Sequence, residues 1–253
     1  MAIFSGDVDL WYEIMGQGRP LILVHGNAAS SRWWDLVYKE LSEYYRAIRV
    51  DLRGFGQSEK PDDGYTVEQL ASDLAEFGRF VVGRNARWVG HSLGGSVLLQ
   101  LALDHPELIE DLILVDPGPA DGMPLSDDLV KSTELTSKDP QLIRQALEFI
   151  SPTADHEGRF FDQLVKEASR AVGWIPMVKA LRTWNIIDRI GEIEAPILVL
   201  EGSEDVLVPP YRLTPMLSRW KDATMTIIPG VGHCLPLEDP ARLVTEIKHF
   251  RHY

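Results

Sequence analysis

The chain has 253 residues, of which 45% are hydrophobic and 25% charged, which is typical of a globular protein with one large domain or two small ones. Its 25 basic and 38 acidic side chains give a formal net charge of −13, which repels phosphate backbones and argues against a nucleic-acid partner. The single cysteine, Cys234, cannot form an internal disulfide, and no Cys/His spacing predicts a metal site.

The first residues, MAIFSGDVDLW, lack the basic and long apolar segments of a signal peptide. No apolar run reaches the ~20 residues that a membrane-spanning helix needs. We therefore expect a cytoplasmic protein without a membrane partner, either a monomer or a homodimer.

Short apolar runs alternate with helical patterns along most of the chain. In chain order, we expect strands at 10–15, 21–24 and 47–50, a helix at 66–82, a strand at 87–89, a helix at 93–105, strands at 112–115, 196–200 and 224–228, and a closing helix from about residue 240. This alternation predicts an α/β fold with a mostly parallel central sheet and helices on both faces. In such sheets, functional residues gather where the strands end.

Residues 120–193 interrupt this alternation, because they contain helical patterns, such as 140–150 and 160–172, but no strand-like run. We expect residues 1–119 and 194–253 to form the core domain and residues 120–193 to form a helical lid at the same sheet edge. Several large side chains are candidates to line a substrate pocket, although packing alone explains each of them: Trp33, Trp34, Trp174, Met177 and Trp184.

The segment WVGHSLGGS places Ser92 between an expected strand and an expected helix. Gly90-His91-Ser92-Leu93-Gly94 fits the pattern G-x-S-x-G in the strand–turn–helix context that the pattern requires. A turn of this kind holds the serine hydroxyl above the sheet edge, where it can act as a nucleophile. A helix that begins at Leu93 would also accept Ser92 as a simple N-cap, so a structural interpretation competes with the catalytic one.

A serine hydroxyl needs a base to remove its proton, and the base needs a partner that holds its tautomer. Among the seven histidines, His233 is the best placed, because its loop, PGVGHC, directly follows the last expected strand. His91 flanks the serine, but its side chain should point away from the hydroxyl. His25 belongs to another loop, where a structural role is expected.

Two aspartates follow expected strands and are candidates for the acid that orients the base. Asp205 lies in EGSED, after the strand at 196–200, and its neighbour Glu204 competes with it for the role. Asp116 ends the strand at 112–115 and remains an alternative. We favour Asp205, and the chain order Ser, Asp, His then matches the order that α/β-hydrolases use.

Acyl transfer also requires donors for the oxyanion. The backbone N–H of Leu93 directly follows the serine, and the N–H of Asn27 lies in the HGNA loop after the strand at 21–24. The side chain of Asn27 is an alternative ligand for a polar substrate group, and HGN could also be an ordinary turn.

Six segments resemble the α/β-hydrolase fold superfamily, in its order and spacing, and the likeness is greatest to its serine-nucleophile esterases and lactonases. They are LILVHGNAASSRWW, IRVDLRGFGQSEKP, WVGHSLGGS, LILVDPGP, PILVLEGSEDVLVP and IPGVGHCLPLEDP. HGNAASSRWW is also similar to the corresponding loop of haloalkane dehalogenases. Those enzymes use an aspartate nucleophile followed by tryptophan, whereas this chain has Ser92 and Leu93. An alkylated serine would be an ether that water does not readily cleave, so we do not expect dehalogenase activity.

The residues and the resemblance together predict a cofactor-free serine hydrolase that cleaves a small to medium carboxylic ester or lactone through an acyl-enzyme. A carbon–carbon bond hydrolase, an enol-lactone hydrolase or a perhydrolase would use the same three residues. The fold also serves as a ligand receptor with slow turnover or none, which is an alternative of another class.

Overall fold

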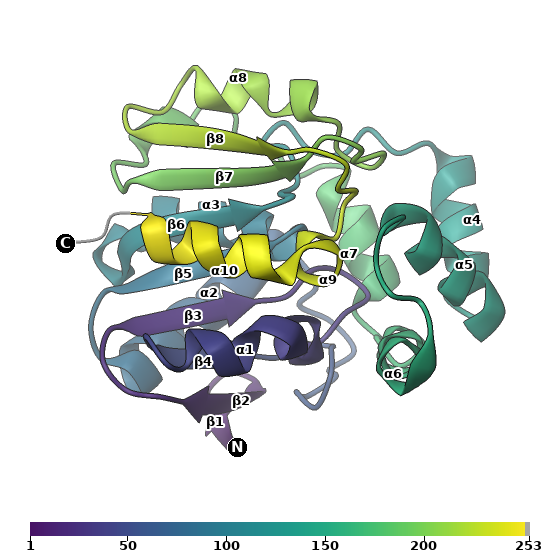
Figure 1. The fold of residues 1–253 in the computed structure, drawn as a ribbon, viewed down its shortest axis with the longest axis horizontal. Coiled ribbons are helices and arrows are strands. Elements are labelled where there is room, and N and C mark those ends of the chain that lie inside the picture. Colours follow the sequence, from purple (N-terminus) through teal and green to yellow (C-terminus); the bar gives the residue numbers. More distant parts are fainter. Residues whose placement is uncertain (251–253) are drawn as a thin grey trace.

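The fully apolar runs of the sequence form the centre of an eight-stranded sheet, seen in a computed structural model that describes residues 1–250 (Figure 1). The strands are β1 (Ala2–Ser5), β2 (Asp9–Met15), β3 (Pro20–Val24), β4 (Arg46–Val50), β5 (Ala86–His91), β6 (Ile109–Val115), β7 (Ile197–Gly202) and β8 (Ala223–Ile228). Their order across the sheet is β1-β2-β4-β3-β5-β6-β7-β8. From β4 to β8 all neighbours are parallel, whereas β2 runs antiparallel to β4 and to β1.

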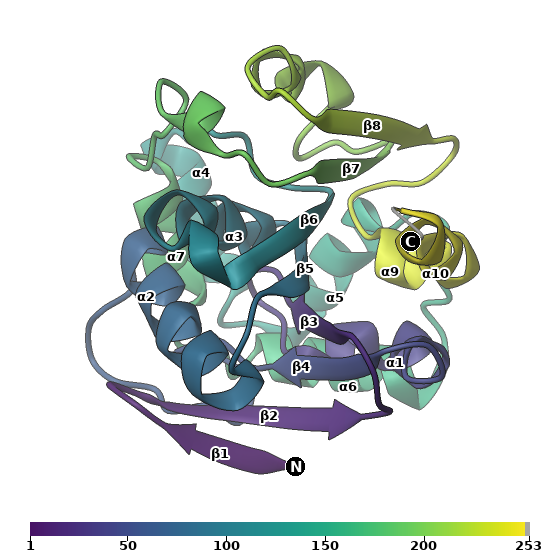
Figure 2. The same cartoon turned by 90° about the vertical axis from the view of Figure 1, so that its left-hand side faces the viewer.

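Helices cover both faces of this sheet (Figure 2). They are α1 (Asp35–Leu41), α2 (Val67–Phe77), α3 (Leu93–Asp104), α4 (Asp127–Thr136), α5 (Pro140–Ile150), α6 (Gly158–Ala168), α7 (Trp174–Leu181), α8 (Thr214–Leu217), α9 (Leu235–Glu238) and α10 (Pro240–His249). Helices α2 and α3 pack together on one face, and α1 and α10 on the other. Every residue of β3, β5 and β7 is buried, as expected of strands with covers on both faces. None of the helices within residues 1–250 is long and apolar enough to cross a membrane.

The mostly parallel α/β sheet that the sequence predicts is confirmed, whereas several local elements differ from expectation, among them α2, which ends at Phe77 instead of near residue 82. The edge strand β1 and the helix α1 were not predicted, because both are short and neither shows a clear hydrophobic period. Helix α6 begins at Gly158 and ends at Ala168, four residues before the predicted end. Thr66 caps α2, since its side chain accepts a hydrogen bond from the N–H of Gln69 at 3.0 Å.

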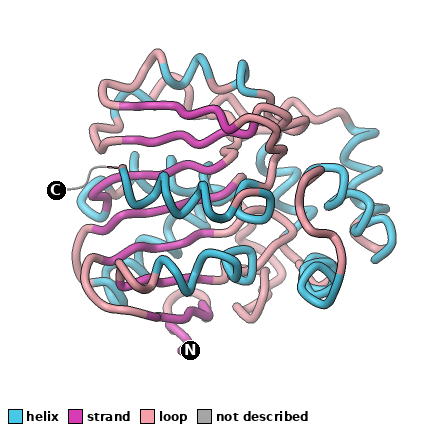
Figure 3. The backbone as a smooth tube through the Cα atoms, in the orientation of Figure 1, coloured by secondary structure: helices cyan, strands magenta, loops and turns pink. Residues whose placement is uncertain are grey.

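Helices α4 to α7 all lie in the chain between β6 and β7, beyond the carboxyl ends of the parallel strands (Figures 1 and 3). Two hydrogen bonds fasten the start of α7 to loops of the sheet. The N–H of Gly173 donates to the carbonyl of Gly54 at 3.2 Å, and Nδ2 of Asn27 donates to the carbonyl of Trp174 at 3.2 Å. This helix is therefore anchored on the loops that follow β3 and β4.

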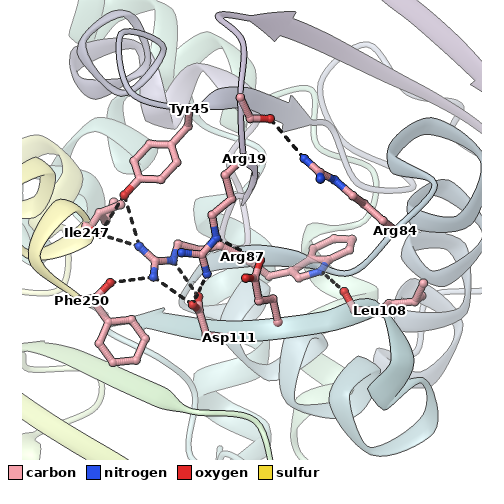
Figure 4. Close-up of polar contacts among 11 residues, drawn as sticks. Arg19, Tyr45, Arg84, Arg87, Leu108, Asp111, Ile247 and Phe250 are labelled. Atoms are coloured by element: carbon pink, nitrogen blue, oxygen red, sulfur yellow. Dashed lines mark hydrogen bonds and ion pairs between the residues drawn. The ribbon is translucent and has the colours of Figure 1, made fainter. Parts of the chain in front are cut away.

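A buried ionic network lies at the other end of the strands, where the parallel strands begin (Figure 4). Arg87 on β5 is 1% exposed and donates to both carboxylate oxygens of Asp111, its register neighbour on β6, at 2.7 and 2.9 Å. The same guanidinium donates to the carbonyls of Ile247 and Phe250 at 2.8 and 2.7 Å. Arg87 thus ties the end of α10 to the centre of the sheet.

Candidate active site

Ser92 occupies a sharp turn between β5 and α3. Its backbone has φ 51° and ψ −117°, a region that residues other than glycine rarely adopt. The neighbouring Gly94 lies so close to β3 that an added Cβ would sit 2.5 Å from the carbonyl oxygen of Val24. Close packing of the helix start against β3 therefore demands glycine there and holds Ser92 at the carboxyl end of the sheet.

The structure brings Ser92, His233 and Asp205 into one hydrogen-bonded chain. Nε2 of His233 lies 2.9 Å from Oγ of Ser92, and Nδ1 lies 2.6 Å from Oδ2 of Asp205. The other oxygen of Asp205 accepts the N–H groups of Leu207 and Val208 at 2.7 and 2.9 Å. An ionised Asp205 requires the proton of neutral His233 on Nδ1, which leaves Nε2 free to accept the serine proton.

Electrostatics favours a charged imidazole at this position. Burial alone lowers the pKa of His233, but the Asp205 carboxylate, with smaller contributions from Asp116 and Glu238, leaves the pKa above its ordinary value. Burial likewise raises the pKa of Asp205, yet the attraction and hydrogen bond of His233 bring it below the ordinary value. The pair is therefore suited to stabilise the imidazolium that forms when a base takes a proton.

Two further histidines support the loops around Ser92. The ring of His91 stacks on Trp33, with centroids 5.1 Å apart, and its Nε2–H donates to the carbonyl of His233 at 2.8 Å. Burial and the neighbouring His233 lower the pKa of His91 to about 3, so this ring stays neutral. His25 accepts the N–H of Leu52 at 3.0 Å and donates to the carbonyl of Gly26 at 2.7 Å.

The two expected oxyanion donors lie just after two adjacent strands, β3 and β5. Leu93 is the first residue of α3, so its N–H has no acceptor within the helix. Asn27 follows Gly26, where an added Cβ would lie 3.1 Å from Cβ of Ser92, so this loop approaches the serine closely. The Asn27 side chain is already engaged, because Oδ1 accepts the N–H of Ala28 at 3.0 Å while Nδ2 binds the Trp174 carbonyl.

Comparison with known proteins identifies the family. A model of the alpha/beta hydrolase family matches residues 21–246. The chain belongs to that family. It is 30% identical to a pimeloyl-[acyl-carrier protein] methyl ester esterase of Vibrio cholerae, over 79% of this chain and 81% of the relative. It is 29% identical to the AB hydrolase superfamily protein YisY of Bacillus subtilis, over 96% and 95%. Among solved structures, an esterase from Exiguobacterium antarcticum superposes with a TM-score of 0.85 at 25% identity. The superposition covers 95% of this chain and 94% of the esterase chain.

The alternative acid of this alpha/beta hydrolase, Asp116, has a different environment. One of its oxygens accepts the N–H of Gly202 at 3.0 Å, and the other accepts the N–H of Leu235 at 3.1 Å. Asp116 thereby links the end of β6 to the end of β7 and to the start of α9. Glu204, the other rival of Asp205, is exposed and accepts a hydrogen bond from the Ser203 hydroxyl at 3.1 Å. Among the three carboxylates, Asp205 is the one bonded to His233.

The five candidate pocket residues lie in different surroundings. Trp34 and Met177 are fully buried, and Trp184 donates its indole N–H to Oε1 of Gln100 at 3.0 Å. Trp33 covers His91, and Trp174 is half-buried at the start of α7. Their contact with a substrate stays a prediction of the sequence.

One group of carboxylates in the hydrolase has the spacing of a possible metal site, among the residues that the structure describes. Asp116, Glu201 and Asp205 each place an oxygen within 4.8 Å of the others. The oxygens of the two aspartates are already occupied by N–H donors, and only Glu201 has none. The sequence analysis did not single out Glu201. Its signal was an acidic residue at the end of the apolar run ILVLE, within a strand that is buried throughout.

Proposed function

We propose that the chain is a serine hydrolase that cleaves a carboxylic ester or lactone through an acyl-enzyme intermediate, with Ser92, His233 and Asp205 as its catalytic residues. The observation that carries this proposal is the chain of two hydrogen bonds, 2.9 Å from Ser92 to His233 and 2.6 Å from His233 to Asp205. A carboxylic ester also fits the family and the esterase names of two of its relatives.

In the proposed reaction, His233 takes the proton of the Ser92 hydroxyl as Oγ attacks the substrate carbonyl. The N–H groups of Asn27 and Leu93 bind the oxyanion that forms, and Asp205 holds the protonated imidazole. His233 then passes its proton to the leaving alkoxide. A water molecule, deprotonated by His233, attacks the acyl-enzyme, and the proton returns to Oγ as the carboxylic acid leaves.

We propose residues 120–193 as a lid that shapes the acyl pocket, above a core formed by residues 1–119 and 194–253. The start of α7 supports this division, because it is bonded to Asn27, whose N–H is the proposed oxyanion donor. A movement of α7 would therefore act on the oxyanion loop directly. A substrate of small to medium size suits an insertion of four short helices.

Labelling with a fluorophosphonate probe tests the nucleophile, run beside hydrolysis of p-nitrophenyl esters of rising chain length. We expect wild-type protein and Ser96→Ala to be labelled, and Ser92→Ala to remain unlabelled. Ser96 is a matched control, because it lies one turn further along α3 and its hydroxyl has no hydrogen-bond partner within residues 1–250. Labelling at Ser92 with negligible ester turnover would favour carbon–carbon cleavage, perhydrolysis or a receptor, and absence of labelling in folded protein would refute the nucleophile.

The pH dependence of kcat/KM tests the proposed base. His233 accepts the serine proton only when neutral, so kcat/KM should fall as the pH drops through its pKa. Because Asp205 raises that pKa, the acid limb should lie above the ordinary histidine value of about 6.5. In Asp205→Asn the limb of the residual activity should move to lower pH, and by more than in Asp116→Asn. Equal shifts in the two variants would contradict Asp205 as the partner of His233.

A further inference from the structure

The side chain of Glu201 has no role in the proposed mechanism, yet it lies directly behind the proposed acid. It is fully buried on β7, and neither of its carboxyl oxygens has a hydrogen-bond partner within residues 1–250. Buried polar groups without partners are rare in folded proteins, so this position requires an explanation. No arginine or lysine pairs with Glu201 in the described part of the chain, and the carboxylates of Asp116 and Asp205 each place an oxygen within 4.8 Å of one of its own.

The three carboxyl groups differ in what stabilises a negative charge. Asp205 has His233 and two backbone N–H donors, and Asp116 has two backbone N–H donors. Glu201 has no donor and faces two acids. Burial, followed by the repulsion of Asp116 and Asp205, raises the pKa of Glu201 to about 12. Burial also raises the pKa of Asp116, but only to about 7, so the most firmly held proton of this cluster belongs to Glu201.

We propose that Glu201 is a neutral carboxylic acid that directs its O–H toward the Asp205 carboxylate and holds that carboxylate in place against His233. The proposal rests on the serine-hydrolase function above and assigns Glu201 as a positioning residue. A neutral Glu201 supplies a donor behind Asp205 without a second negative charge. An ionised Glu201 would repel Asp205. Its added negative charge would also stabilise the protonated form of His233, which would hinder the transfer of that proton to the leaving group.

Other titratable groups surround the two aspartates and belong to the same electrostatic unit. His233 and Cys234 come from the loop after β8, and His91 from the end of β5. Burial raises the pKa of the Cys234 thiol well above its usual value, and burial lowers that of His91, so both stay neutral. The negative charge that faces His233 therefore comes from Asp205 and Asp116, with a smaller contribution from Glu238.

Two substitutions separate the parts of this proposal. Glu201→Gln keeps the size and one neutral donor, so kcat and KM should stay within a few-fold of wild type. Glu201→Met fits an apolar strand but has no donor, so kcat should fall, by up to about 10²-fold if Asp205 shifts by an ångström, while KM changes little. Equal activity of the two variants would overturn the positioning role.

Thermal unfolding across pH 5 to 9 tests the protonation state without a substrate, so its outcome is independent of the serine-hydrolase function. An acid whose folded-state pKa is raised stabilises the fold most below its unfolded pKa of about 4.3, and loses stability as the pH rises above it. Glutamine does not titrate, so the Tm of Glu201→Gln should exceed that of wild type by an amount that grows with pH. Infrared spectra at pH 9, where Asp116 is ionised, should show a protonated carboxyl band in wild type that this variant lacks.

The exposed Glu204→Gln is the matched control and should show no pH-dependent gain. A Tm difference between Glu201→Gln and wild type that is flat or falls with rising pH would overturn the neutral acid. So would a rise in the wild-type Tm on addition of CaCl2 or MgCl2 that Glu201→Gln lacks, since the three carboxylates would then form a cation site.

Discussion

Replacing Ser92 by alanine is expected to lower kcat on an activated ester by on the order of 10⁶-fold while leaving the protein folded. The serine hydroxyl is the nucleophile that forms the acyl-enzyme, and Oγ contacts His233 at 2.9 Å. Alanine keeps the Cβ that already tolerates the strained turn at φ 51°, so the β5–α3 junction should survive. Initial rates on a p-nitrophenyl ester, with Tm measured in parallel, check both halves of this expectation.

Two further variants serve as a control and as a second test of the hydrogen-bonded chain. Ser96→Ala should retain wild-type rates, because Ser96 takes no part in the hydrogen-bonded chain. Asp205→Asn should lose about 10⁴-fold in kcat, since asparagine would favour the wrong tautomer of His233. A Ser92→Ala protein that still turns over the ester at more than a hundredth of the wild-type rate would place the nucleophile elsewhere.

The central sheet was predictable from sequence because its strands are apolar on both faces and are separated by clear helical segments. Strand β3, for example, is buried at every position and appears in the sequence as the uninterrupted run LILV after Pro20. The edge strand β1 could not be found in this way, because its residues are largely exposed and its structure depends on pairing with β2. Helix α1 spans only seven residues and is stabilised by packing against α10, which lies two hundred residues away.

Some features of the candidate site were likewise predictable from the local sequence, whereas others depend on how distant elements pack together. Ser92, Asp205 and His233 were predictable because each follows a strand that ends at the same edge of the sheet. The anchoring of His233 by the His91 ring and the position of Glu201 behind Asp205 were not, because they depend on the lateral spacing of β5, β7 and the loop after β8. The sequence left the role of Asp116 open. In the structure its side chain accepts N–H groups from β7 and α9, so it connects the end of β6 to both elements.

Replacing Arg87 by methionine is expected to reduce the free energy of unfolding by about 3–5 kcal/mol, the largest stability effect that we predict. The substitution leaves the buried carboxylate of Asp111, which is 2% exposed, without its two-pronged partner. It also removes the Arg87 donors of the Ile247 and Phe250 carbonyls at the end of α10, although Ile247 keeps the Tyr45 hydroxyl as a donor at 3.3 Å. The remaining contact of Arg19 with Asp111, at 2.6 Å, should place the loss toward the lower end of this range. Urea unfolding followed by circular dichroism measures it.

A double-mutant cycle distinguishes a broken ion pair from lost packing (Figure 4). Arg87→Met combined with Asp111→Leu removes both charges, so the double variant should be more stable than Arg87→Met alone, even though α10 has lost the same two hydrogen bonds. Arg84→Met provides a surface control, because the hydrogen bond that Arg84 donates to the carbonyl of Gly18, at 3.3 Å, is exposed and its loss should cost little. If the double variant instead loses as much free energy of unfolding as the two single variants together, the network stabilises the fold through its hydrogen bonds to α10 and not through the pairing of charges. The network lies at the end of β5 opposite Ser92, so in either case the fluorophosphonate labelling of folded protein should be retained.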